Sequence, residues 1–272
     1  MGMQRHFLTG CASGIGRHLA GVLQARGDWV AACDLDLPTL RIIAREDGWD
    51  PERVHCFGFD VTDGAAWQRV WPEAVAALGH IDTLLNIAGV LDAAYVLDSD
   101  DALVDRTLDV NVKGVMFGTR VAADYMVHKG SGHIINIASI AGLVAAPGLS
   151  VYCASKFAVR AYTLAAALEL RPRGVDVTVV CPASINTPMF QRQRDNDAAE
   201  LFYSGLQILT LDDIEHAIVR RALGARPLEV HVPRGKARLS QFVNVFPSLA
   251  SLFLPLYQWS GRRRMRRHRA QD

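Results

Sequence analysis

The chain has 272 residues, of which 50% are hydrophobic, and a formal net charge of +1. A chain of this length can bury one large core, which is normal for a single α/β domain. The charge is uneven, because residues 262–272 hold six arginines and one aspartate and leave a slightly acidic body. A slightly acidic body argues against a protein that binds nucleic acid through its surface charge.

The cysteines and the first residues predict a reducing, cytoplasmic environment. The five cysteines are odd in number and lack metal-ligand spacing, so we predict reduced core residues and no metal site. The first apolar run begins almost at once, at His6, so we expect no signal peptide. The cysteines are Cys11, Cys33, Cys56, Cys153 and Cys181.

The first elements predict a phosphate-binding turn. Residues 3–9 are predicted to form a short buried strand. Glycines follow between Gly10 and Gly16, and residues 15–26 show the apolar period of a helix that ends at Gly27. A glycine-rich turn between a strand and a helix lets the backbone approach a pyrophosphate at the helix N-terminus. An ordinary tight turn between strand and helix is the alternative.

The second predicted strand, Trp29 to Cys33, ends in Asp34. An acidic residue there is placed to accept hydrogen bonds from an adenosine ribose, and it would repel a 2′-phosphate. This pattern favours NAD over NADP. Asp36 is predicted to be a solvated turn residue.

The rest of the chain alternates helices and strands, which predicts a doubly wound parallel sheet, a Rossmann-like α/β fold in three layers. Asp60 is a turn former or a partner of an adenine amine, and Thr62 or Asp63 caps the next helix. Thr210 is predicted to cap a later helix. The predicted helices cover residues 39–47, 64–79 and 101–128 and a segment from Tyr152 to about Leu170; the further strands cover 54–59, 81–85, 133–138, 176–181 and 228–232.

Tyr152 and Lys156 are four residues apart, so they lie on one face of a helix. A free phenol has a pKa of about 10, and an ammonium one turn away stabilises the phenolate and lowers that pKa. The pair therefore predicts a tyrosine that exchanges a proton with an alcohol or a carbonyl. Ser139 follows the strand 133–138, at the sheet edge where open α/β sheets bind ligands.

With these motifs in order, the chain resembles the short-chain dehydrogenase/reductase family, in its compact single-domain branch, over roughly residues 3–232. Two positions depart from the family pattern, Ile87 and Ala183, of which the second bears on the nicotinamide pocket. The resemblance implies the catalytic set Asn111, Ser139, Tyr152 and Lys156, with Asn111 holding a proton-relaying water. It also implies that the cofactor contacts Gly10, Ser13, Gly14, Ile15, Gly16, Asp34, Asp60, Val61, Asn86, Ala88, Gly89, Tyr152, Lys156, Pro182 and Thr187.

The resemblance implies an NAD(H)-dependent oxidoreductase that interconverts a secondary alcohol and a ketone. Apolar residues in 140–149 and 189–209 favour a hydrophobic substrate, steroid-like or long-chain, although Arg192 and Arg194 leave an anionic group open. A dinucleotide-binding sensor or scaffold without turnover is the alternative function. A homodimer or homotetramer is expected by resemblance alone.

Residues 1–241 are predicted to form the catalytic domain and residues 242–272 a C-terminal arm. The arm combines an apolar stretch from Phe242 to Trp259 with the arginine run, and its two prolines argue against a membrane-spanning helix. We expect the apolar stretch to pack on its own cleft or on a second subunit, with peripheral membrane contact as an addition.

Overall fold

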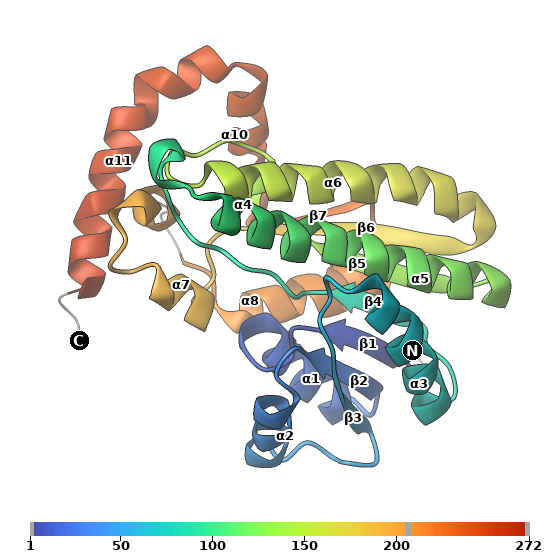
Figure 1. Cartoon of the computed structure of the whole chain (residues 1–272). Helices are drawn as coiled ribbons and strands as arrows, with labels where there is room; N and C mark the ends of the chain where they lie inside the picture. The colour runs from blue at the N-terminus through green and yellow to red at the C-terminus, as the bar shows by residue number, and fades with distance from the viewer. Residues whose placement is uncertain (1–2, 205–207, 270–272) are drawn as a thin grey trace.

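A computed structural model describes residues 3–204 and 208–269 and arranges them around one parallel sheet (Figure 1). The strand order is β3-β2-β1-β4-β5-β6-β7, with every neighbouring pair parallel, so the predicted doubly wound sheet is confirmed. The winding direction reverses between β1 and β4, which leaves a crevice at the carboxyl ends of these strands. The strands are β1 (Arg5–Thr9), β2 (Trp29–Asp34), β3 (Val54–Gly58), β4 (Thr83–Asn86), β5 (Gly132–Ile137), β6 (Val175–Pro182) and β7 (Glu229–Val232).

Helices cover both faces of the sheet and give the three predicted layers. Neighbouring residues of β1 show this, because Leu8 joins a buried cluster with Leu19 of α1, whereas Phe7 stacks on Trp67 of α3. The helices of the first 170 residues are α1 (Gly14–Ala25), α2 (Leu37–Glu46), α3 (Gly64–Leu78), α4 (Asp101–Leu108), α5 (Gly114–Lys129) and α6 (Ser150–Leu170). The later helices are α7 (Pro188–Arg192), α8 (Leu211–Glu215), α9 (Leu223–Ala225), α10 (Arg234–Val245) and α11 (Pro247–Arg269).

The predicted helix over 101–128 is not one regular α-helix. A π-helical turn, Asp109–Lys113, separates α4 from α5 and carries the fully buried Asn111. Such a turn accommodates an extra residue and is frequent at functional sites. It therefore changes the direction in which the buried amide of Asn111 points without breaking the helical run.

Two predicted helix caps are present. The Asp63 carboxylate accepts a hydrogen bond from the Ala65 N–H, so Asp63 caps α3, and Thr62 does not. Thr210 and Asp213 form a reciprocal capping box on α8. Both helices therefore begin where the sequence pattern predicts.

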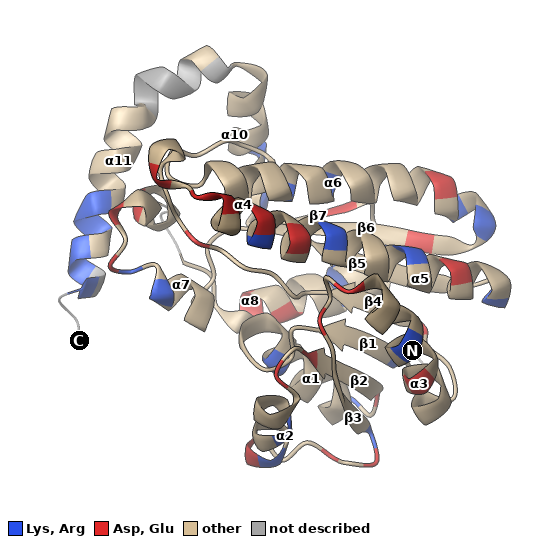
Figure 2. Ribbon diagram, viewed as in Figure 1, with Lys and Arg blue, Asp and Glu red and all other residues tan. Residues whose placement is uncertain are grey.

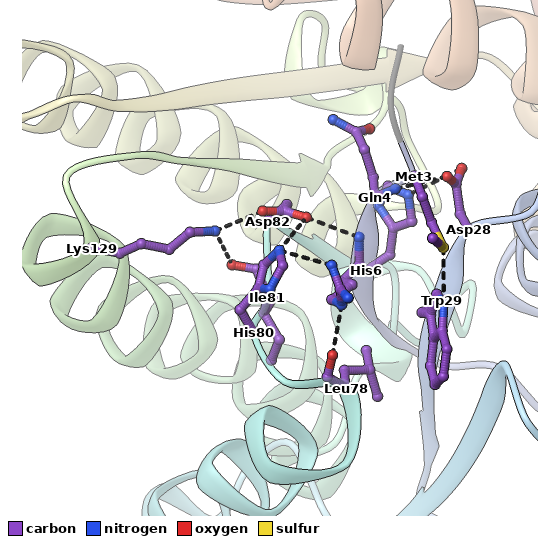
Figure 3. Close-up of polar contacts among 11 residues, drawn as sticks. Met3, Gln4, His6, Asp28, Trp29, Leu78, His80, Ile81, Asp82 and Lys129 are labelled. Carbon is purple, nitrogen blue, oxygen red and sulfur yellow. Dashed lines mark hydrogen bonds and ion pairs between the residues drawn. The ribbon is translucent and has the colours of Figure 1, made fainter.

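Polar contacts tie the amino ends of the central strands together (Figure 3). Asp82, just before β4, accepts hydrogen bonds from the Arg5 N–H at 3.0 Å and from Lys129 Nζ at 2.6 Å. Lys129 also donates to the Ile81 carbonyl, and His80 Nε2 lies 3.2 Å from the Asp82 carboxylate. Burial raises the pKa of Asp82, but the bonds from Lys129 and Arg5 outweigh it and leave that pKa lowered. The carboxylate thus joins β1, β4 and α5.

The C-terminal arm comprises α10 and α11, and the predicted boundary at residue 242 falls inside α10. α11 packs against a short 3₁₀ segment, Asp197–Tyr203, which we call the lid. The contact lies near the basic end of α11, where Met265 is buried and Gly261 meets the Glu200 carbonyl. The packing of the apolar stretch on its own cleft or on a second subunit stays a prediction; at the end of that stretch Trp259 is exposed. Among the described residues, no helix is long and apolar enough to cross a membrane.

Candidate active site

A cavity opens at the carboxyl ends of the strands, at the point where the winding reverses. Its volume is about 320 Å³. The predicted residues that line it are Gly10, Ser13, Gly14, Ile15, Asp34, Asp60, Val61, Ala88, Gly89, Ser139, Tyr152, Lys156, Pro182 and Thr187. The predicted cofactor turn and three of the four predicted catalytic side chains therefore meet in one space.

The glycine-rich turn brings the N-terminus of α1 to the cavity. Gly10 has a φ of 74°, and a Cβ there would lie 2.9 Å from the Ala88 Cα, so a side chain would push β1 away from β4. A Cβ at Gly16 would come within 2.1 Å of the Gly10 carbonyl oxygen. Gly16 does not line the cavity; it permits close packing of α1 beneath the turn. The N-terminus of α1, where Gly14 and Ile15 line the cavity, is thus placed to bind an anion.

Asp34 ends β2 and lines the cavity as predicted. Its carboxylate accepts hydrogen bonds from the Ala12 N–H at 2.8 Å and from the Asp36 N–H at 3.3 Å. These bonds fix the carboxylate beside the glycine turn. Asp60 also lines the cavity and accepts a bond from the Thr62 N–H, so it forms a turn and still faces the cavity.

The Tyr152 side chain is buried, and its phenol lies near the Ser139 hydroxyl in the wall of the same cavity. Ser139 is held in turn, because its hydroxyl accepts from the Ala141 N–H at 3.1 Å and donates to the Pro182 carbonyl at 3.4 Å. Burial raises the pKa of Tyr152 well above its usual range, against the lowering effect of the nearby Ser139 hydroxyl. The prediction that Lys156 lowers the pKa of Tyr152 is therefore wrong for this structure. Helical spacing predicts that the two side chains lie together, but it does not predict that both are buried.

Lys156 lies beside the tyrosine, with Nζ 5.6 Å from the centre of the Tyr152 ring. Nζ donates a hydrogen bond of 3.0 Å to the Ile137 carbonyl at the end of β5. Burial lowers the pKa of Lys156 to about 8, so the ammonium still predominates at neutral pH. Lys156 thus presents a positive charge to the cavity beside Tyr152.

Asn111 does not line the cavity but braces the elements that do. Its side-chain oxygen accepts from the Val90 N–H at 2.8 Å, and its Nδ2 donates to the Val90 carbonyl at 2.9 Å. Nδ2 also donates to the Ser155 hydroxyl at 3.1 Å, and Ser155 donates to the Tyr152 carbonyl at 2.7 Å. Sequence analysis did not single out Ser155, although it sits between Tyr152 and Lys156 on the same helix. These bonds join the π-helical turn, the loop after β4 and α6.

Asn86 lies in the interior, away from the cavity. Its Nδ2 donates to Asn136 Oδ1 at 2.8 Å, within a buried network that also holds Thr119. The cavity is instead reached by the loop that follows, where Thr9 accepts bonds from the N–H groups of Ile87 and Ala88 at 3.0 and 3.1 Å. Thr9 is a further residue that sequence analysis missed, because a threonine at a strand end has no distinctive pattern.

The far side of the cavity is apolar. It is lined by Met189 and Phe190 of α7 and by Phe202 of the lid. Phe190 and Phe202 have ring centres 5.4 Å apart. Arg192 is exposed and is absent from the lining, so the described geometry gives no support to the predicted anionic alternative at that residue.

Two groups among the described residues bring three potential metal-ligand atoms within 4.8 Å of one another. They are His18, Asp212 and Glu215, and Cys181, Glu229 and His231. In the second group Arg160 already donates two hydrogen bonds to the Glu229 carboxylate, at 2.6 and 3.2 Å. Neither group lines the cavity. All five cysteines are free, as predicted.

Comparison with known proteins identifies relatives over most of the chain. A family model described as short chain dehydrogenase matches residues 5–198. The 2-(R)-hydroxypropyl-CoM dehydrogenase of Xanthobacter autotrophicus is 37% identical over 193 residues, which are 69% of this chain and 77% of that protein. The family match stops at residue 198, so nearly all of the lid and the whole arm lie beyond it.

Solved structures agree in fold. A short chain dehydrogenase/reductase from Burkholderia phymatum, in complex with NAD, has a TM-score of 0.80 and 26% identity and covers 91% of this chain and 95% of that chain. A structure of ElxO with NADP bound has a TM-score of 0.75 and 23% identity and covers 84% of this chain and 97% of that chain. The similar structures thus include complexes with each of the two nicotinamide dinucleotides.

Proposed function

This chain belongs to the short-chain dehydrogenase family, and from that premise we propose that it is an NAD(H)-dependent oxidoreductase that interconverts a secondary alcohol and a ketone. The observation that carries the proposal is the pairing of Tyr152 with Ser139 in the wall of one cavity, which the N-terminus of α1 also lines. When bound, a nicotinamide cofactor supplies or accepts the hydride. The protein then has to supply the proton and the position of the substrate.

Tyr152 is the proposed proton donor and acceptor. Its raised pKa keeps the phenol protonated at neutral pH, which suits transfer of a proton to a carbonyl oxygen. Ser139 is the proposed second hydrogen-bond donor to that oxygen, because its hydroxyl lies beside the Tyr152 phenol in the same cavity. The Lys156 ammonium favours the phenolate left after the transfer, since an opposite charge stabilises the ionised form.

NAD rather than NADP is the proposed cofactor. The Asp34 carboxylate is fixed at the cavity wall by the Ala12 and Asp36 N–H groups, so it cannot turn away easily from a bound ribose. A 2′-phosphate at this place would meet a like charge, and the described cavity lining includes no Arg or Lys other than Lys156. We therefore expect a preference for NAD of at least about tenfold in kcat/KM.

A hydrophobic alcohol or ketone, steroid-like or long-chain, is the proposed substrate. The apolar part of the cavity lining supports this substrate class. It includes Met189, Phe190 and Phe202. A panel of hydrophobic secondary alcohols and ketones would identify the substrate. A homodimer or homotetramer is proposed on family grounds, and light scattering measures it.

The decisive experiment compares Tyr152→Phe with Tyr162→Phe, a second tyrosine on α6 whose hydroxyl bonds the Met116 carbonyl. With the best substrate of the panel, we expect Tyr152→Phe to lose about 10²–10⁴-fold in turnover. NAD affinity should stay close to that of the unchanged protein, and Tyr162→Phe should keep near-native turnover. Near-native turnover in Tyr152→Phe would refute the mechanism, and NAD binding without turnover on the whole panel would favour a sensor or scaffold.

A further inference from the structure

The C-terminal arm carries an unusual concentration of exposed apolar side chains, which we call the arm face. On α10 they follow the spacing of one helical face, and Phe242 and Phe246 have ring centres 5.1 Å apart. Their exposed fractions lie between 46 and 68%, and four of the seven are aromatic. The residues of the arm face are Leu239, Phe242, Val245, Phe246, Leu256, Tyr257 and Trp259.

The arm stands beside the body of the molecule instead of covering the sheet (Figure 1). α10 is anchored near its start, where Ala237 is fully buried in the main core. The basic end of α11 is held because Arg262 pairs with the buried Glu200 and Arg269 pairs with Asp197. Between these two anchors the residues of the arm face stay exposed in the described chain. Monomeric proteins seldom leave apolar patches of this kind open without a partner.

The positive charge of the arm indicates what kind of partner surface would bind it. The two helices of the arm, residues 234–269, contain nine Lys and Arg and no Asp or Glu. At the end of α11, where Figure 2 shows basic residues gathered, Arg263, Arg266 and Arg267 are exposed. Among the described residues none of the three has an acidic partner, and Arg263 lies over the Trp259 ring at 5.5 Å. An apolar face bordered by unpaired arginines is complementary to a surface that is both apolar and anionic.

We propose that the arm face docks on the surface of an anionic lipid bilayer. Trp and Tyr favour the boundary between headgroups and acyl chains, and exposed arginines bind anionic headgroups. A second copy fits less well, because a twofold contact between two arms would bring arginines together without carboxylates from either arm. The contact is interfacial, since the two helices present their apolar residues beside basic ones instead of forming a spanning segment.

Docking has a consequence for the cavity. α11 packs on the lid, and Phe202 of the lid lines the apolar side of the cavity. An arm held at a bilayer therefore places the substrate side of the cavity next to the lipid phase. This consequence rests on the proposed function, whereas the docking itself does not.

The test is co-sedimentation of the purified full-length protein with vesicles of phosphatidylcholine alone and of phosphatidylcholine with phosphatidylglycerol, at low and high salt. One variant combines Arg263→Gln, Arg266→Gln and Arg267→Gln. Its matched control changes three exposed arginines elsewhere, Arg45→Gln, Arg69→Gln and Arg173→Gln. A second variant combines Phe242→Ser and Trp259→Ser, and its control combines Leu97→Ser and Leu168→Ser, which are 98 and 72% exposed.

We expect binding to the anionic vesicles at low salt and release at high salt. The arm-arginine variant should bind roughly a hundredfold more weakly, from the contribution of each arginine near an anionic leaflet. The Phe242/Trp259 variant should also lose binding, and both controls should keep it; thermal melting checks that every variant is folded. Absence of binding to anionic vesicles would overturn the proposal, as would equal losses in variants and controls. A dimer that the Phe242/Trp259 variant splits, without vesicle binding, would assign the face to a second copy.

Discussion

The ion pair between Arg160 and Glu229 offers a quantitative test of how β7 is fastened to the helix that carries Tyr152 and Lys156. Arg160 lies one turn after Lys156 on α6, and its guanidinium donates two hydrogen bonds to the Glu229 carboxylate. His231, whose Nε2 lies 3.7 Å from the Glu229 carboxylate, and the hydrogen bonds from Arg160 together outweigh burial and lower the pKa of Glu229 from 4.5 to about 2. We predict that Glu229→Gln destabilises the protein in a pH-dependent way.

The magnitude follows from the shift in pKa between the unfolded and folded states. For a fully buried carboxylate, a fall from 4.5 to about 2 corresponds to about 3 kcal/mol of folding free energy. The two side chains are 27 and 21% exposed, and solvent screening reduces the expected loss to about 1–2 kcal/mol at pH 7. Because the folded pKa is the lower one, the stabilisation is complete above pH 4.5 and disappears as the pH falls towards 2.

The measurement is urea unfolding of the unchanged protein and of Glu229→Gln at one protein concentration, at pH 7 and at several values below 4.5. The control is Asp109→Asn, which breaks the exposed pair of Asp109 with Lys113 and should cost less than about 0.5 kcal/mol. The difference between Glu229→Gln and the unchanged protein should shrink as the solution is acidified. A difference that is independent of pH, or no larger than that of the control, would refute the reasoning.

Three further predictions concern the cavity and the lid. Asp34→Ala should narrow the preference for NAD over NADP, measured as the ratio of kcat/KM values; an unchanged ratio would remove Asp34 from cofactor selection. Lys156→Ala should lower both turnover and NAD affinity, because the ammonium faces the cavity, and unaltered NAD affinity in calorimetry would contradict that position. Gly261→Ala should detach α11 from the lid and raise KM for large substrates, since its Cβ would lie 2.1 Å from the Glu200 carbonyl oxygen. Gly224→Ala is the matched control, because a Cβ at Gly224 meets no other atom within 4 Å. Equal effects of the two substitutions would argue against a role of the contact between α11 and the lid.

Most of the fold could be predicted because each strand is a nearly continuous apolar run between polar turns, which is typical of a sheet buried on both faces. Element ends were displaced where side chains intervene. The predicted strand 81–85 starts at Thr83, because the Asp82 side chain takes the N–H of Arg5 and the ammonium of Lys129. The π-helical turn at Asn111 was not predictable from periodicity, since the apolar pattern continues through it.

The site was predictable in its members but not in its electrostatics. Motif spacing identified Tyr152 and Lys156, yet burial decides that the pKa of the phenol rises and that of the ammonium falls. The arm shows a similar limit. Composition favoured packing of the apolar stretch on its own cleft or on a second subunit; in the described chain the lid contact includes Met265, which lies within the arginine run. Which face of a helix meets its neighbour depends on the path of the chain, and composition alone does not fix that path.

The contacts around Asp82 have a practical meaning for anyone who wants a heat-resistant catalyst. They fasten β1, β4 and α5 at the amino ends of the strands, whereas Tyr152 and Lys156 meet at the carboxyl ends. A strand of five residues spans about 16 Å, so the two regions are well separated. Substitutions that far apart tend to act additively. Directed evolution can therefore raise the melting temperature at one end of the sheet while leaving the turnover number, which is set at the other end, as it was.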